Sequence, residues 1–165
     1  MPEPRAELER LLGPEGVGRD PSGTPRAFPD TAESLGEVLT LVEQFGWRAR
    51  LEGRGSWLAT DAPADLSIST RALDEFMAID LSKQVVTIGA GMSLEVLARR
   101  LAAFALWLPW DPPGRPDRSV GAVLATGTSG PLRAAFGDPA SYLERAVLAT
   151  GDGRLLELAV NAARS

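Results

Sequence analysis

The chain has 165 residues, of which 44% are hydrophobic and 24% charged, values typical of a soluble globular domain with one core. Its net charge of −5 argues against a nucleic-acid partner. The absence of Cys and His excludes disulfides, thiolate nucleophiles, imidazole proton transfer and ordinary zinc sites, so we expect no metal site. The N-terminus is polar, unlike a signal peptide, and no apolar run is long enough to span a membrane. We therefore expect a cytoplasmic protein.

The N-terminal part of the chain predicts a helix, a connector, a second helix and a strand. Residues 6–12 form a short amphipathic pattern, and the Gly- and Pro-rich stretch 13–29 is typical of a surface connector. Asp30 and Glu33 make a capping-box pattern before the second helix. Residues 47–51 alternate as in a strand.

A glycine-rich turn, Glu52-Gly-Arg-Gly-Ser-Trp57, follows that strand directly. Successive backbone N–H groups in such a turn can form a concave nest that holds a phosphate. The alternative is an ordinary turn that ends the strand, and the residues alone leave both interpretations open.

The middle of the chain predicts three strands, at 65–70, 76–80 and 84–88, and a helix capped by Ser93. Between the last strand and this helix, Gly-x-Gly at 89–91 resembles a dinucleotide fingerprint. The third glycine of that fingerprint is missing, so a Rossmann-type site competes with a plain strand-to-helix turn.

A Pro-rich segment, Leu108-Pro-Trp-Asp-Pro-Pro113, leads into a run of small residues from Ser119 to Gly130. Such a run allows a ligand or another chain segment to approach the backbone closely. Asp138 and Pro139 then begin one helical turn, and residues 145–160 predict a β-hairpin. Helices and strands in this irregular order indicate an α+β protein.

These segments together resemble a known family, the PCMH-type FAD-binding domain of the vanillyl-alcohol oxidase kind. Within it, the chain is most similar to the E-type FAD-binding subunit of bacterial glycolate oxidase. The similarity extends over residues 29–158. The motifs that carry it are Pro29-Asp-Thr-Ala-Glu-Ser-Leu35, Arg50-Leu-Glu-Gly-Arg-Gly-Ser56, Val86-Thr-Ile-Gly-Ala-Gly91, Leu108-Pro-Trp-Asp-Pro-Pro113, Ser119-Val-Gly-Ala122, Gly127-Thr-Ser-Gly-Pro-Leu-Arg133 and Val147-Leu-Ala-Thr-Gly-Asp-Gly153.

The resemblance implies an α+β, two-subdomain PCMH-type fold that binds FAD non-covalently between the subdomains, with the second subdomain incomplete. Residues 1–28 would form the N-terminal helix and connector, 29–64 the first subdomain and 65–165 the second. Backbone amides of two loops would hold the cofactor. The implied FAD-binding residues are Gly53, Arg54, Gly55, Ser56, Trp57, Pro112, Gly121, Ala122, Ala125, Thr126, Ser129 and Gly130.

Two residues depart from the family pattern. Arg54 stands in the middle of what is usually a run of three glycines, and Ala122 replaces a second glycine. If position 54 needs a positive φ, a non-glycine residue there is strained, although its guanidinium could pair with a phosphate. The family's closing segment after the hairpin is also not matched in this sequence.

No residue of this chain is expected to be catalytic. FAD would carry the redox step, and no His is available as a base. The remaining polar candidates have simpler roles: Asp111, Asp117 and Asp138 suit turns and caps, Arg54, Arg115, Arg118 and Arg133 suit the solvated surface, and Tyr142 suits the core.

Three hypotheses follow. The chain is the FAD-binding subunit of a glycolate oxidase-type enzyme, inactive alone and working with flavin and iron–sulfur subunits. Alternatively, it is a cofactor-free, shortened relative that acts as a scaffold and exposes an apolar face. The third is a Rossmann-type nicotinamide enzyme, which predicts a parallel sheet with a helix starting at Gly91.

Overall fold

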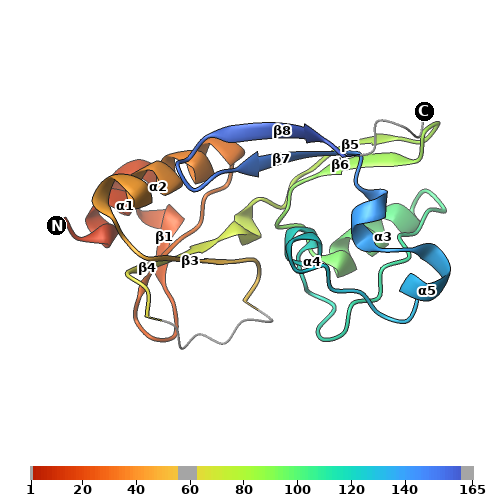
Figure 1. Cartoon of the computed structure of the whole chain (residues 1–165), viewed down its shortest axis with the longest axis horizontal. Coiled ribbons are helices and arrows are strands. Elements are labelled where there is room, and N and C mark those ends of the chain that lie inside the picture. Colours follow the sequence, from red (N-terminus) through yellow and green to blue (C-terminus); the bar gives the residue numbers. More distant parts are fainter. Residues whose placement is uncertain (1, 56–62, 161–165) are drawn as a thin grey trace.

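The computed structural model describes residues 2–55 and 63–160 and shows two lobes crossed by a long hairpin (Figure 1). The first lobe contains α1 (Pro4–Leu12), η1 (Pro14–Gly16), β1 (Val17–Arg19), β2 (Pro25–Ala27), α2 (Ala32–Phe45), β3 (Ala49–Glu52), β4 (Leu66–Ser69) and η2 (Thr70–Ala72). The second contains β5 (Phe76–Asp80), β6 (Val85–Ile88), α3 (Leu94–Ala102), α4 (Val120–Thr126), α5 (Arg133–Phe136) and η3 (Pro139–Tyr142). The hairpin is β7 (Arg145–Ala149) and β8 (Leu155–Ala159).

The first lobe is built on a four-stranded sheet in the order β1-β2-β4-β3. β4 pairs in parallel with β2 and β3, and β1 pairs antiparallel with β2. Side chains alternate across a strand, so Leu66 and Ile68 of β4 lie in the apolar core while Ser67 and Ser69 point to the opposite face. The core also takes in buried residues of α1, α2, β1 and β2 and of the link between α2 and β3: Leu8, Val38, Val17, Ala27 and Trp47.

The connector expected at 13–29 was wrong, because the structure places β1 and β2 there. Each strand has only three residues and contains Gly or Pro, so the sequence shows no alternation of apolar and polar residues that would predict it. Val17 and Ala27 pair across the two strands and are both buried.

α2 begins one residue later than its capping pattern suggested. Thr31, not Asp30, is the N-cap: its Oγ1 accepts from the Ser34 N–H at 3.0 Å, and Ser34 Oγ accepts from the Thr31 N–H at 3.1 Å. Both capping patterns are present one residue apart, and the sequence does not choose between them.

The second lobe packs α3 and α4 against the β5–β6 hairpin. β5 and β6 pair antiparallel and α3 begins at Leu94 after its Ser93 cap, which contradicts the Rossmann hypothesis of a parallel sheet and a helix at Gly91. The segment 119–130, expected as a loop, contains α4, capped by Ser119 and ended by Gly127 in the left-handed conformation. Its Val120 packs in the core with Leu97 of α3.

The β7–β8 hairpin lies over α2, and its tip makes close backbone contact with that helix (Figure 1). A Cβ on Gly36 would stand 2.6 Å from the Gly153 carbonyl oxygen, and Thr40 Oγ1 lies 3.4 Å from Asp152 O. Apolar side chains of both strands are exposed: Val147, Leu148, Leu155, Leu156 and Leu158.

None of the helices in the described ranges is both long and apolar enough to cross a membrane.

Candidate functional site

The two glycine-rich segments singled out in the sequence meet in the structure. Gly53, directly after β3, packs against the start of α4 so closely that a Cβ on Gly53 would overlap Ser119 Oγ and lie 3.2 Å from Ala122 Cβ. Ser119 is fully buried and caps α4 by accepting from the Ala122 N–H at 3.3 Å. Residues more than sixty positions apart thus form one wall, at the junction of the two lobes.

Arg54 does not strain the loop. Within the described residues, positive φ outside glycine occurs only at Gln84 and Ala105, whereas Gly55 has φ of 71°. The left-handed position of the turn is therefore held by a glycine. Arg54 Nη1 donates to the Gly91 carbonyl at 3.1 Å, so this side chain joins the loop to the turn before α3.

Arg54 also lines the edge of a cavity of about 700 Å³ at the carboxyl ends of β2, β3 and β4. Arg71, stacked over the Phe28 ring with 4.3 Å between Cζ and the ring centroid, lies on the same cavity. Open α/β sheets bind ligands outside the carboxyl ends of their parallel strands, which is where this cavity lies.

The backbone N–H groups at the start of α4 donate to acceptors within the protein. The Gly121 N–H donates to Ala90 O at 2.8 Å, and the Ala122 N–H to Ser119 Oγ. A Cβ on Gly121 would lie 2.9 Å from Ala90 O, so glycine is required here for packing of chain against chain. Ala125 and Thr126, further along α4, are exposed.

Three other candidate residues, Pro112, Ser129 and Gly130, lie around Asp111. Gly130 packs on the Asp111 backbone, and the Asp111 carboxylate accepts from the Leu132 N–H at 3.1 Å. Pro112 and Ser129, next to these two residues in the chain, are half-buried. Ser56 and Trp57 lie outside the described residues.

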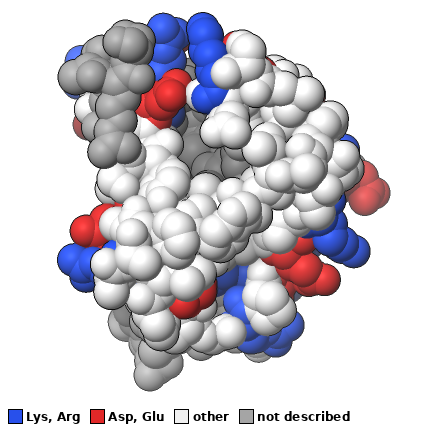
Figure 2. Space-filling view, turned by 90° about the vertical axis from the view of Figure 1, so that its right-hand side faces the viewer, with Lys and Arg blue, Asp and Glu red and all other residues white. Residues whose placement is uncertain are grey.

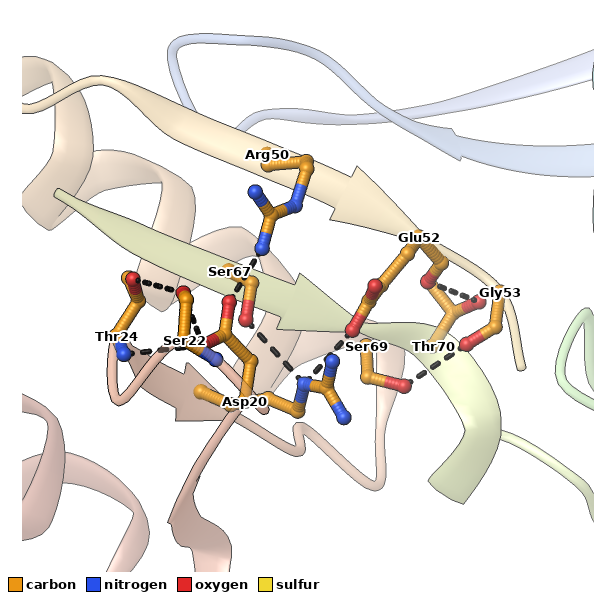
Figure 3. Close-up of polar contacts among 10 residues, drawn as sticks. Asp20, Ser22, Thr24, Arg50, Glu52, Gly53, Ser67, Ser69 and Thr70 are labelled. Atoms are coloured by element: carbon orange, nitrogen blue, oxygen red, sulfur yellow. Dashed lines mark hydrogen bonds and ion pairs between the residues drawn. The ribbon is translucent and has the colours of Figure 1, made fainter. Parts of the chain in front are cut away.

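A buried polar cluster, which the sequence did not reveal, supports the strand that carries Gly53 (Figure 3). On the polar face of the sheet, Arg26 Nε lies 2.8 Å from Glu52 Oε1 and 3.3 Å from Ser67 Oγ. Arg50 pairs with Asp20, whose carboxylate is also held by the turn that follows β1. The signal that could have found this cluster is the alternation of polar residues along β3 and β4.

The Asp20 carboxylate is ionised more readily than an exposed one. Burial by itself raises the pKa of Asp20, but hydrogen bonds from Ser22, Thr24 and Arg50 outweigh this effect, and the pKa lies below the ordinary value of 3.8. Removing one member of a buried pair leaves an uncompensated charge and costs about 3–5 kcal/mol. The cluster therefore ties β2 to β3 and β4, and ties the turn after β1 to β3.

Some polar candidates have roles other than those expected. Arg118 is only 2% exposed and Tyr142 is 40% exposed, so the assignments of Arg118 to the surface and Tyr142 to the core were wrong. The Tyr142 hydroxyl donates to Phe136 O at 2.8 Å, and its ring packs edge-on against Trp110. Arg115 and Arg133 are exposed and pair with Asp117 and Asp138.

Figure 2 shows a hollow in the face formed by the second lobe, lined mostly by uncharged residues, with Lys, Arg, Asp and Glu around the periphery. Within the described residues, no group of three or more acidic side chains could hold a metal ion.

Comparison with known proteins identifies the family. A model of the FAD binding domain family matches residues 25–159. The chain belongs to this family. Among curated proteins, L-gulonolactone oxidase 2 of Arabidopsis thaliana is 30% identical over 109 residues, which are 63% of this chain and 18% of that protein.

Solved structures agree with this family. An alkyldihydroxyacetonephosphate synthase superposes with a TM-score of 0.84 and 19% identity, over 99% of this chain and 36% of its own. A variant of Phl p 4, a glucose dehydrogenase, gives a TM-score of 0.80 and 13% identity, over 95% of this chain and 38% of its own. The α+β, PCMH-type fold expected from the sequence is thus confirmed, and the chain spans well under half the length of these relatives.

FAD is the cofactor of this FAD-binding domain, and the residues present are compatible with it. A dinucleotide needs bare backbone at its pyrophosphate, and the turn after β3 offers Gly55, where a Cβ would meet only Glu52 Oε2, at 3.9 Å; the bare side of Gly53 is taken up by α4. Within the described residues, the N–H groups of Arg54 and Gly55 donate to no backbone or side-chain acceptor. The match to this family does not favour the cofactor-free alternative.

The contact between Gly53 and Ser119 gives a test of the site's architecture. We expect Gly53→Ala to destabilise the fold by about 1–3 kcal/mol through overpacking, and Ser119→Ala to cost about 1 kcal/mol through loss of the cap. In the double variant the overlapping oxygen is gone, so the two losses should combine to less than their sum, by about 1 kcal/mol.

Urea unfolding of the four proteins measures this coupling. Gly151→Ala is the matched control, because no atom lies within 4 Å of the space its Cβ would fill. Strictly additive losses would contradict the contact.

Proposed function

We propose that this chain is the FAD-binding part of an oxidoreductase of the glycolate oxidase type, which oxidises 2-hydroxy acids. The observation that supports it most is the single wall made by Gly53 and the start of α4, two segments that the sequence had assigned to one cofactor. The names of its relatives, an oxidase and a dehydrogenase, support an oxidoreductase. The segment Leu108-Pro-Trp-Asp-Pro-Pro113 supports the 2-hydroxy-acid type by its resemblance to the glycolate oxidase subunit.

In this proposal the chain binds and orients the cofactor. The N–H groups of Arg54 and Gly55 donate to the pyrophosphate, and the segment 119–130 lies along the dinucleotide. Bound FAD supplies the chemistry, because it takes up the two electrons removed from the substrate. These 165 residues contain neither His nor Cys, so none of them can attach FAD through an imidazole or a thiol.

The groups that bind substrate and accept its proton come from further protein in this proposal. The carboxylates that could act as a base serve the fold: Asp111 holds the Leu132 N–H, and Asp117 and Asp138 pair with arginines. A partner or a further segment would pack on the uncharged, hollowed face of the second lobe (Figure 2). Flavin and iron–sulfur subunits are the partners proposed.

Titration of the purified chain with FAD tests cofactor binding. At a free FAD concentration one hundred times the Kd, a site specific to the native state stabilises the fold by about 2.7 kcal/mol. For a domain of this size we expect the Tm to rise by about 5–10 °C, with quenching or enhancement of flavin fluorescence. Riboflavin, which lacks the pyrophosphate, is the control and should shift the Tm less. An unchanged Tm at millimolar FAD would contradict the proposal.

The substrate class is tested on the native assembly, recovered from its source cells through a tag on this chain. Glycolate or another short 2-hydroxy acid, added without oxygen, should bleach the flavin absorbance. Bleaching by a sugar lactone and not by 2-hydroxy acids would contradict the glycolate oxidase type while leaving FAD binding intact.

A further inference from the structure

Two hydroxyl groups at the end of β4 hold the first two carbonyl groups of the glycine-rich turn (Figure 3). Ser69 Oγ donates to Gly53 O at 2.8 Å, and Thr70 Oγ1 donates to Glu52 O at 3.4 Å. Ser69 is only 2% exposed and lies directly opposite Glu52 in the parallel pairing of β3 with β4. The turn therefore leaves β3 with its backbone fixed from the neighbouring strand.

Fixing these carbonyls also fixes the amides that follow them. A trans peptide unit is planar, and its C=O and N–H point in opposite directions. The described residues contain no cis peptide bond. Because Glu52 O and Gly53 O both face the end of β4, the N–H groups of Gly53 and Arg54 both face away from it. The Arg54 N–H, one of the two donors proposed for the pyrophosphate, is thereby directed away from β4, and successive N–H groups in a turn form concave anion-binding sites.

Of the two buried serines on β4, Ser69 holds a carbonyl group of the turn, and within the described residues Ser67 does not. Ser67 and Ser69 are two residues apart on β4, point to the same polar face and are both buried. Ser67 Oγ accepts from Arg26 Nε at 3.3 Å, and among the described residues no hydrogen bond joins it to the turn. The structure thus contains a matched pair of buried serines, one on the turn and one on the ion-pair cluster.

We propose that Ser69 is a positioning residue for the cofactor: by holding the Gly53 carbonyl it aims the Arg54 N–H at the pyrophosphate of FAD. This inference rests on the proposed function, since it assumes that the turn is where the pyrophosphate binds. Thr70 assists through a longer bond. Neither hydroxyl touches the cofactor.

The test compares three ligands on the full chain and its variants. ADP carries the pyrophosphate without the flavin, and riboflavin carries the flavin without the pyrophosphate. Ser69→Ala should raise the Kd of FAD and of ADP by about tenfold, the effect of one misaligned hydrogen bond to a charged group, and leave the Kd of riboflavin unchanged. Ser69→Thr, which keeps the hydroxyl, should restore the binding of ADP. Ser67→Ala is the control and should bind ADP as the wild type does, whatever its Tm.

Each outcome decides the question. ADP binding that Ser69→Ala leaves unchanged, or that Ser67→Ala weakens equally, would overturn the positioning role while FAD binding stands. Failure of the wild type to bind FAD and ADP would overturn the proposed function and this inference together. If Ser69→Ala does not fold, Ser69→Cys, with a similar volume and a weak donor, is compared with Ser67→Cys in the same way.

Discussion

The close approach of Gly53 to Ser119 is the constraint on which the rest of this structure depends. There is no room for a Cβ between the end of β3 and the start of α4, so the first lobe meets the second through bare backbone. Ser119 serves this contact, caps α4 and bridges to Ser93, the cap of α3. The buried Ser119 hydroxyl thus lies where α3 and α4 begin and where the glycine-rich turn contacts α4. These shared contacts hold the junction in one arrangement, in which backbone groups can face a ligand.

Ion pairs on the polar face of the sheet position β3, and with it the turn that reaches this junction. Burying charges is expensive unless each has a partner, and the pairs Arg26–Glu52 and Arg50–Asp20 satisfy one another with good geometry. Because Glu52 is both a member of a pair and the last residue of β3, the cluster determines where the strand ends. Fold stability and the position of β3 are therefore carried by the same charged side chains, and loss of one partner of the Arg26–Glu52 or Arg50–Asp20 pair is expected to affect both.

The features that the sequence predicted are those encoded locally. α2, α3 and the β7–β8 hairpin follow from helical spacing, caps and a Gly-Asp-Gly turn, each readable within about fifteen residues. β1 and β2 could not be found this way, because these three-residue strands with Gly and Pro are defined by their pairing, β1 with β2 and β2 with β4. The contact of Gly53 with Ser119 is equally nonlocal and was not predicted: the family resemblance implied only that the two segments bind one cofactor. The roles of Arg118 and Tyr142 depend on tertiary packing and were missed for that reason.

We propose that the turn after β3 and the start of α4 form one cofactor site. The most direct measurement is an NMR titration of the ¹⁵N-labelled chain with FAD, following the backbone amides. We expect the largest shifts at Arg54 and Gly55 and within 119–130, in one saturating transition. Shifts confined to the residues around the cavity of Phe28, Arg71 and Asp74, with none at Arg54 or Gly55, would contradict this proposal.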